Sequence, residues 1–263
     1  MRIEYVPQLR LLQELYQQPR GMDRFYWYLQ QMLGEDDDGE LDVVVPMTGA
    51  NPMGREHCLE AVNALLAIDA DRVAQEAAAE ALPHFADVDV TVRLSVTLLD
   101  DLKGGWTNRY LTEAGMRMCT DPRLERGAIR RRQFVVVPCW TSETYTPDRV
   151  RALTRACLYR FAHLYQHGLP RTLRDIMTLD GKARAFAGER PTLSEEELEY
   201  TAHVLAPHMD SESFPIQFAC LYGDEAARQV GYAPQGLSAY AGWELALDMA
   251  LKRQSTASAP TWP

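Results

Sequence analysis

The chain has little lysine: it occurs only at Lys103, Lys182 and Lys252 among 263 residues, so arginine supplies nearly all of the positive charge. Acidic residues outnumber basic ones by 37 to 27, which gives a formal net charge of −10. A charge of this sign repels the phosphate backbone of nucleic acids, and the densest basic cluster is the short run at 130–132. We therefore expect no nucleic-acid partner.

The five cysteines include no C-x-x-C pair and are odd in number, which argues against a zinc ribbon and against a secreted disulfide framework. No apolar run approaches the roughly 20 residues that a membrane-spanning helix needs. Charged residues also interrupt the apolar positions of 1–18, unlike the core of a signal peptide. These absences predict a soluble protein without a membrane partner, working in the reducing cytoplasm.

Three runs rich in β-branched residues predict strands at 41–47, 89–99 and 133–140. Helical patterns separate them, at 53–82 with a break near its middle and again between the second and third runs. A strand, a helical crossover and another strand is typical of a βαβ unit. The sequence therefore predicts an α/β fold with a small, mostly parallel three-stranded sheet; a mixed α+β sheet is the alternative. Alternation in the second run indicates an edge strand or one wet face.

Helical patterns also flank the predicted sheet on both sides along the chain. Apolar spacing in 1–33 predicts a helical hairpin, and nearly all of 147–253 reads as helix. We expect a single domain over 1–253, with 41–140 as its α/β part, followed by a loose tail at 254–263.

The first candidate segment, 46–56, joins the first predicted strand to a helix. Asn51 is a good helix cap, and the amides at a helix start bind anions, with Thr48 and the Arg55 guanidinium nearby. The glycine spacing is similar to a P-loop, but Arg55 and Glu56 replace the residues that contact phosphate and magnesium, which excludes a nucleoside-triphosphate site. An ordinary strand-to-helix turn is the alternative.

The second candidate segment begins at Asp100, directly after the second predicted strand. Asp101, Lys103, Asn108 and Arg109 crowd carboxylate, ammonium, amide and guanidinium groups together, a useful set for holding a polar small molecule. The alternative is a wide turn in which Arg109 pairs with Asp100 or Asp101.

The carboxyl ends of parallel strands meet at one edge of a sheet, where ligands of open α/β sheets bind. We therefore predict an enzyme or binding protein for a small, polar, anionic ligand at that edge. Arg55, Lys103 and Arg109 would hold the charge, and Asp101 or Glu143 would act as acid or base. The predicted edge set consists of Thr48, Asn51, Arg55, Asp101, Lys103, Asn108, Arg109, Thr141, Ser142 and Glu143.

His163 and His167 lie four residues apart on the helix expected from 147, a spacing that suits one divalent metal ion. It is the histidine spacing of the zinc-protease helix H-E-x-x-H, but Leu164 stands in place of the catalytic glutamate. The missing general base argues against ordinary zinc-protease activity, and a metal-dependent, hydrolase-like protein is the second hypothesis. Histidines exposed or acting only in support of a site are the alternative. Apart from this metal, no cofactor is indicated.

A third hypothesis is a non-catalytic interaction module with an acidic, helix-rich surface. The closing segment 223–245 mixes small residues with aromatic ones, which fits core packing or a homodimer surface. No motif names a reaction or a substrate.

Overall fold

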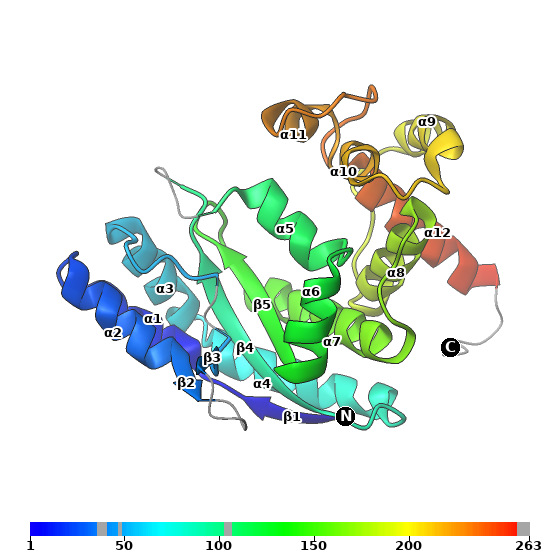
Figure 1. Ribbon diagram of the computed structural model, residues 1–263. Coiled ribbons are helices and arrows are strands. Elements are labelled where there is room, and N and C mark those ends of the chain that lie inside the picture. The colour runs from blue at the N-terminus through cyan, green and yellow to red at the C-terminus, as the bar shows by residue number, and fades with distance from the viewer. Residues whose placement is uncertain (36–40, 47–48, 103–106, 257–263) are drawn as a thin grey trace. The chain divides into compact units, whose positions relative to one another are not determined.

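The computed structural model describes residues 1–35, 41–46, 49–102 and 107–256 (Figure 1). This chain forms two compact units: unit 1 consists of Met1–Arg109 and Arg123–Gln166, and unit 2 of Tyr110–Pro122 and the described chain from His167 onward. The single domain expected over 1–253 stays a prediction, and the expected loose tail lies almost wholly outside the described residues. No helix in the described part of the chain is long and apolar enough to cross a membrane.

Unit 1 contains a three-stranded parallel sheet of β1 (Arg2–Tyr5), β4 (Thr91–Leu99) and β5 (Phe134–Trp140). Figure 1 shows β4 between β1 and β5, and both pairings are parallel. This confirms the α/β class, the small parallel sheet and two of the three predicted strands.

β4 is the central strand and is covered on both faces. Val96 on one face and Thr97 on the other are both completely buried. The sequence prediction of an edge strand or a wet face is therefore wrong, because β1 occupies the outer position and polar Ser95 and Thr97 are buried along with the apolar residues.

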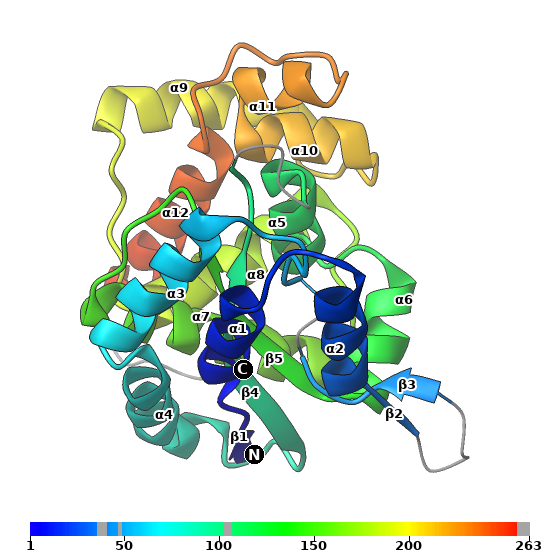
Figure 2. The same cartoon turned by 90° about the vertical axis from the view of Figure 1, so that its left-hand side faces the viewer.

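The first predicted strand, 41–47, does not belong to this sheet. Its start forms β3 (Leu41–Val43), which pairs antiparallel with β2 (Leu33–Glu35), and Figure 2 shows this pair as a separate ribbon at the end of α2 (Met22–Met32). Only five residues separate β2 from β3, so their pairing costs less chain entropy than a long-range pairing. The sheet position falls instead to β1, so the predicted N-terminal helical hairpin begins with a strand.

Asp42 on β3 anchors this pair to the chain before β5. Its Oδ1 accepts hydrogen bonds from Arg132 Nε (3.0 Å) and Nη2 (2.7 Å) and from Arg131 Nη2 (3.0 Å). The bonds from Arg132 are the main reason that the pKa of Asp42 lies below its ordinary value of 3.8.

The depressed pKa of Asp42 predicts a pH-dependent contribution to stability. An ionised, paired Asp42 stabilises the fold above the unfolded-state pKa of about 3.9, and this stabilisation is lost as pH falls through the lower folded-state pKa. Because Arg131 is half exposed, we expect Asp42→Asn to cost only about 1 kcal/mol at neutral pH and less near pH 3. Urea unfolding at both pH values measures the difference in free energy of unfolding between the wild type and the variant. A difference that grows towards acidic pH would contradict the prediction.

Helices α1 (Gln8–Gln17), α3 (Glu56–Ala67) and α4 (Ala70–Ala81) contact β4. The predicted break in the 53–82 helical region is confirmed, and it falls at Asp69, whose φ of 54° is left-handed. A 3-10 turn at Leu82–Phe85 leads to β4. After α6 (Pro122–Leu124) and a π-helix at Glu125–Arg131 comes β5, followed by the predicted long helix, α7 (Pro147–His167).

Unit 2 is helical, which confirms the helix-rich C-terminal half. Trp243, in the closing segment, is completely buried in the core of its own unit, while the homodimer surface stays a prediction. Two helices of unit 2, α8 (Leu173–Phe186) and α12 (Ala241–Thr256), approach so closely that a Cβ at Gly181 would lie 2.1 Å from the carbonyl oxygen of Ala246, which only glycine permits. The helices are α5 (Arg109–Arg117), which starts at the end of unit 1, α8 (Leu173–Phe186), α9 (Glu195–Leu205), a 3-10 turn at Ala206–His208, α10 (Phe214–Tyr222), α11 (Asp224–Gln229) and α12 (Ala241–Thr256).

Candidate functional site

Polar side chains meet where β4 and β5 end, as the parallel sheet predicts. Asp101 follows β4, and its two carboxylate oxygens accept hydrogen bonds from the Ser142 amide (3.0 Å) and hydroxyl (2.6 Å) after β5. The Thr141 hydroxyl lies 3.1 Å from Asp100 Oδ1 and 3.0 Å from Asp101 Oδ1, so it can donate to either. The structure therefore brings together Asp101, Thr141 and Ser142 of the predicted edge set.

Asp100 is a buried carboxylate that joins three segments of unit 1. Its Oδ1 accepts from the Leu102 amide (3.2 Å) and contacts His57 Nε2 (2.8 Å), while its Oδ2 accepts from Asn51 Nδ2 (2.7 Å). Burial raises the pKa of Asp100, but the hydrogen bonds from His57, Asn51 and Leu102 outweigh it, and the net pKa is lowered. The ionised form is thus the one that the fold stabilises.

Arg109 holds the acidic residues of the edge. Its guanidinium donates to Ser142 Oγ (2.9 Å) and Asp101 Oδ2 (3.4 Å), forms an ion pair with Glu143, and lies 5.3 Å from the centre of the Trp140 ring. The pairing with Asp101 is the one foreseen by the wide-turn alternative. Its positive charge is therefore already compensated by two carboxylates of the protein.

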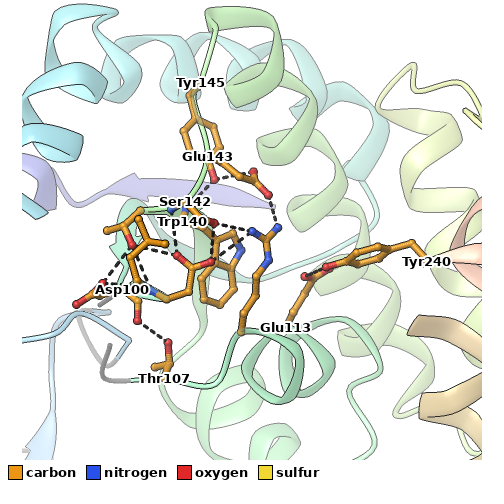
Figure 3. A network of polar contacts seen from close by, with 12 residues as sticks. Asp100, Thr107, Glu113, Trp140, Ser142, Glu143, Tyr145 and Tyr240 are labelled. Carbon is orange, nitrogen blue, oxygen red and sulfur yellow. Dashed lines mark hydrogen bonds and ion pairs between the residues drawn. The ribbon is translucent and has the colours of Figure 1, made fainter. Parts of the chain in front are cut away.

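Glu143 is fixed from the other side by Tyr145. The tyrosine hydroxyl donates to Glu143 Oε2 (3.0 Å) and accepts from the Trp140 amide (2.6 Å), as Figure 3 shows. Burial raises the pKa of Tyr145, so this hydroxyl stays a donor. Glu143 and Arg109 still keep 30% and 26% of their side chains exposed, whereas Asp101 keeps only 6%, so solvent reaches the site through the first two.

The other predicted ligand-binding residues fare differently. Asn51 does not cap α3, which begins five residues later; its side chain accepts from the Met53 amide (2.9 Å) and donates to Asp100, so the fold uses both of its ends. Arg55 is exposed directly before α3, and Asn108 is exposed before α5. Thr48 and Lys103 lie outside the described residues.

Sequence reasoning missed His57 and Cys58, which follow the first candidate segment directly. Cys58 Sγ lies 3.5 Å from His57 Nε2, the nitrogen that also contacts Asp100. Cys58 is completely buried, and this burial, together with the Asp100 carboxylate, raises its pKa to about 12. The signal that could have identified them was the presence of a histidine and a cysteine at the start of a helix that faces the end of the central strand.

His57, Cys58 and Asp100 form the one group of three or more candidate metal ligands among the residues that the structure describes. The predicted pair, His163 and His167, is not part of it. No third ligand of the described chain joins that pair, whose metal binding stays a prediction.

The described side chains of the edge carry more negative than positive charge. Asp100, Asp101 and Glu143 are opposed by Arg109, while His57 adds a positive charge only when protonated. The arrangement can therefore accept hydrogen bonds or hold a cation more readily than it can hold an anion.

Comparisons with protein-family models, curated proteins and solved structures found no match to this chain.

Proposed function

We propose that this chain binds a small polar ligand at the carboxyl edge of β4 and β5. Glu143 accepts hydrogen bonds from the ligand, Arg109 fixes the carboxylates of Glu143 and Asp101, and Asp101 keeps Arg109 in position. The observation that carries the proposal is the convergence of these three residues, from three segments of the chain, on one partly exposed network. Ligands of parallel α/β sheets bind at this edge.

The charges favour a neutral or cationic ligand over the anion expected from the sequence. An anion would have to compete with Asp101 and Glu143 for Arg109 and would leave those carboxylates without their cation. Hydroxyl and ammonium groups, in contrast, donate to carboxylates without breaking the existing pairs. The ligand class is therefore a polyol, an amine or a molecule that carries both groups.

The same carboxylates are the candidates for acid–base chemistry, should the bound ligand react. A general base must come within hydrogen-bond reach of the proton that it removes. Glu143 meets solvent and has a tyrosine hydroxyl on its Oε2, whereas Asp101 is held by three neighbouring groups. Glu143 is therefore the proposed base and Asp101 the proposed orienting group.

Thermal unfolding with a small-molecule library tests the proposal. The library contains matched neutral, cationic and anionic compounds, such as glucose, glucosamine and glucose 6-phosphate, and all samples contain a metal chelator. A ligand at ten times its Kd adds about 1.4 kcal/mol of stability, which raises Tm by about 3–6 °C. We expect such shifts from polyols or amines in the wild type and their loss in Asp101→Asn and Glu143→Gln.

Asp89→Asn is the matched control, because Asp89 is a carboxylate of the same unit with 92% of its side chain exposed. Its ligand-induced shifts should equal those of the wild type. Shifts that persist in both site variants, shifts from anionic compounds alone, or no shift from any compound would contradict the proposal.

A further inference from the structure

We infer that His57, Cys58 and Asp100 form a binding site for one divalent transition metal ion of the zinc class. The inference goes beyond the ligand site proposed above and does not depend on it. It concerns different side chains, and it can be tested with the metal alone.

The donor atoms already have nearly the spacing that a metal would impose. The imidazole nitrogen, the thiol sulfur and a carboxylate oxygen all lie within 4.8 Å of one another. Tetrahedral zinc, with Zn–N of about 2.0–2.1 Å and Zn–S of about 2.3 Å, separates its nitrogen and sulfur ligands by about 3.5 Å. The Nε2–Sγ distance is 3.5 Å, whereas the hydrogen-bonded Nε2–Oδ1 pair at 2.8 Å would open by about half an ångström.

The pattern of contacts fits converging ligands better than a catalytic cysteine. In a nucleophile–histidine–acid triad the nucleophile and the acid bond to opposite nitrogens of the imidazole. Here the Cys58 thiol and the Asp100 carboxylate both meet Nε2 of His57, while Nδ1 is buried without a partner in the described chain. Cys58 is also completely buried, so no substrate reaches its sulfur.

Neighbouring groups fix two of the three ligands. Asn51 Nδ2 and the Leu102 amide orient the Asp100 carboxylate from outside the group, as outer partners do in metal sites. Gly54 brings the backbone against the thiol, because a Cβ there would lie 2.5 Å from Cys58 Sγ. A larger residue at position 54 would therefore displace the thiol.

The donor types select the metal. A sulfur ligand disfavours Mg²⁺ and Ca²⁺, which prefer oxygen, and a mixed set of sulfur, nitrogen and oxygen suits Zn²⁺ and Co²⁺. Three protein ligands leave a fourth position, which a water molecule would fill.

Titration of the metal-free protein with Co²⁺ tests the site through its absorption spectrum. We expect one equivalent to bind, with the visible bands of tetrahedral cobalt and a thiolate-to-cobalt absorption in the near ultraviolet. Cys58→Ser should remove the thiolate absorption, and His57→Gln, which keeps a donor towards Asp100, should weaken binding by more than about 100-fold. Two controls should bind like the wild type: Cys220→Ser, at a completely buried cysteine of unit 2, and the double variant His163→Ala/His167→Ala.

X-ray absorption of the zinc-loaded wild type keeps the test decisive if a variant does not fold. One sulfur at about 2.3 Å together with nitrogen or oxygen ligands is the expected shell. Absence of sulfur, two or more sulfurs, a cobalt spectrum that survives Cys58→Ser, or one that disappears in either control would overturn the inference.

Discussion

Asp100→Asn is expected to lower the free energy of unfolding by about 3 kcal/mol, measured by urea unfolding with a chelator present. The substitution places an amide NH₂ where a buried carboxylate accepts hydrogen bonds at both oxygens. Asn51 cannot adapt by turning its amide over, because its own oxygen already accepts from the Met53 amide. The new NH₂ group therefore faces an N–H donor of its neighbours, and the contact with His57 no longer involves a carboxylate charge.

The control for this prediction is Asp89→Asn, the same chemical change at an exposed position, which should cost less than about 0.5 kcal/mol. A loss of stability in Asp100→Asn no greater than in the control would show that Asp100 does not hold the three segments together. In that case the network around the edge of β4 would have no structural role.

Asp180→Asn is expected to destabilise unit 2 by about 3–5 kcal/mol, since it removes one partner of a buried ion pair. Asp180 is completely buried and binds Arg117 through both oxygens, at 2.8 Å and 3.3 Å. Arg117 in turn donates to Glu113 (2.7 Å) and lies 4.0 Å from the centre of the Trp243 ring. Without the Asp180 charge, the guanidinium stays in the core with one carboxylate only.

Asp210→Asn is the matched control, because Asp210 also pairs with an arginine of its unit, Arg174, but with 84% of its side chain exposed. Exposed pairs contribute about 0–1 kcal/mol, so this variant should unfold close to the wild type. Urea unfolding measures the free energy of unfolding of both variants. If Asp180→Asn and Asp210→Asn lowered it equally, the assignment of Asp180 to the core of unit 2 would be contradicted.

The sequence was sufficient to predict the long elements. β4 and β5 lie in runs rich in β-branched residues, and α7 has a hydroxyl at Thr146, proline in its first position and an acid in its first turn. Each of these signals is local, so it survives without knowledge of the rest of the fold. The direction of the two strands followed from the helical crossover between them.

Short or partner-dependent elements were not predictable in this way. β1 has only four residues, too few for its alternation to stand out from the helical pattern that follows. The run at 41–47 has the composition of a strand, but composition does not determine which strand it pairs with. In the structure, the start of this run pairs with the nearby β2. The central position of β4 likewise depends on its pairing with β1, which lies far away in the chain, and its burial depends on helices such as α1, α3 and α4.

The location of the site could be predicted from the sequence, but the hydrogen bonds and ion pairs within it could not. Parallel strands bring Asp101 and Glu143 to one edge of the sheet, and Arg109 comes eight residues after Asp101 in the sequence. Which of them pair is decided by side-chain geometry, and the compensation of Arg109 is the reason that we propose a neutral or cationic ligand in place of the expected anion. His57 and Cys58 were missed because their partner, Asp100, comes from a segment more than 40 residues later.

Calorimetric titration tests whether the carboxylates at the edge of β4 and β5 hold a ligand. The library compound with the largest thermal shift is titrated into the wild type, Glu143→Gln, Asp101→Asn and the control Asp89→Asn, all with a chelator. We expect at least about tenfold weaker binding in the two site variants, equivalent to about 1.4 kcal/mol, and unchanged binding in the control. Equal affinities in all four proteins would contradict it.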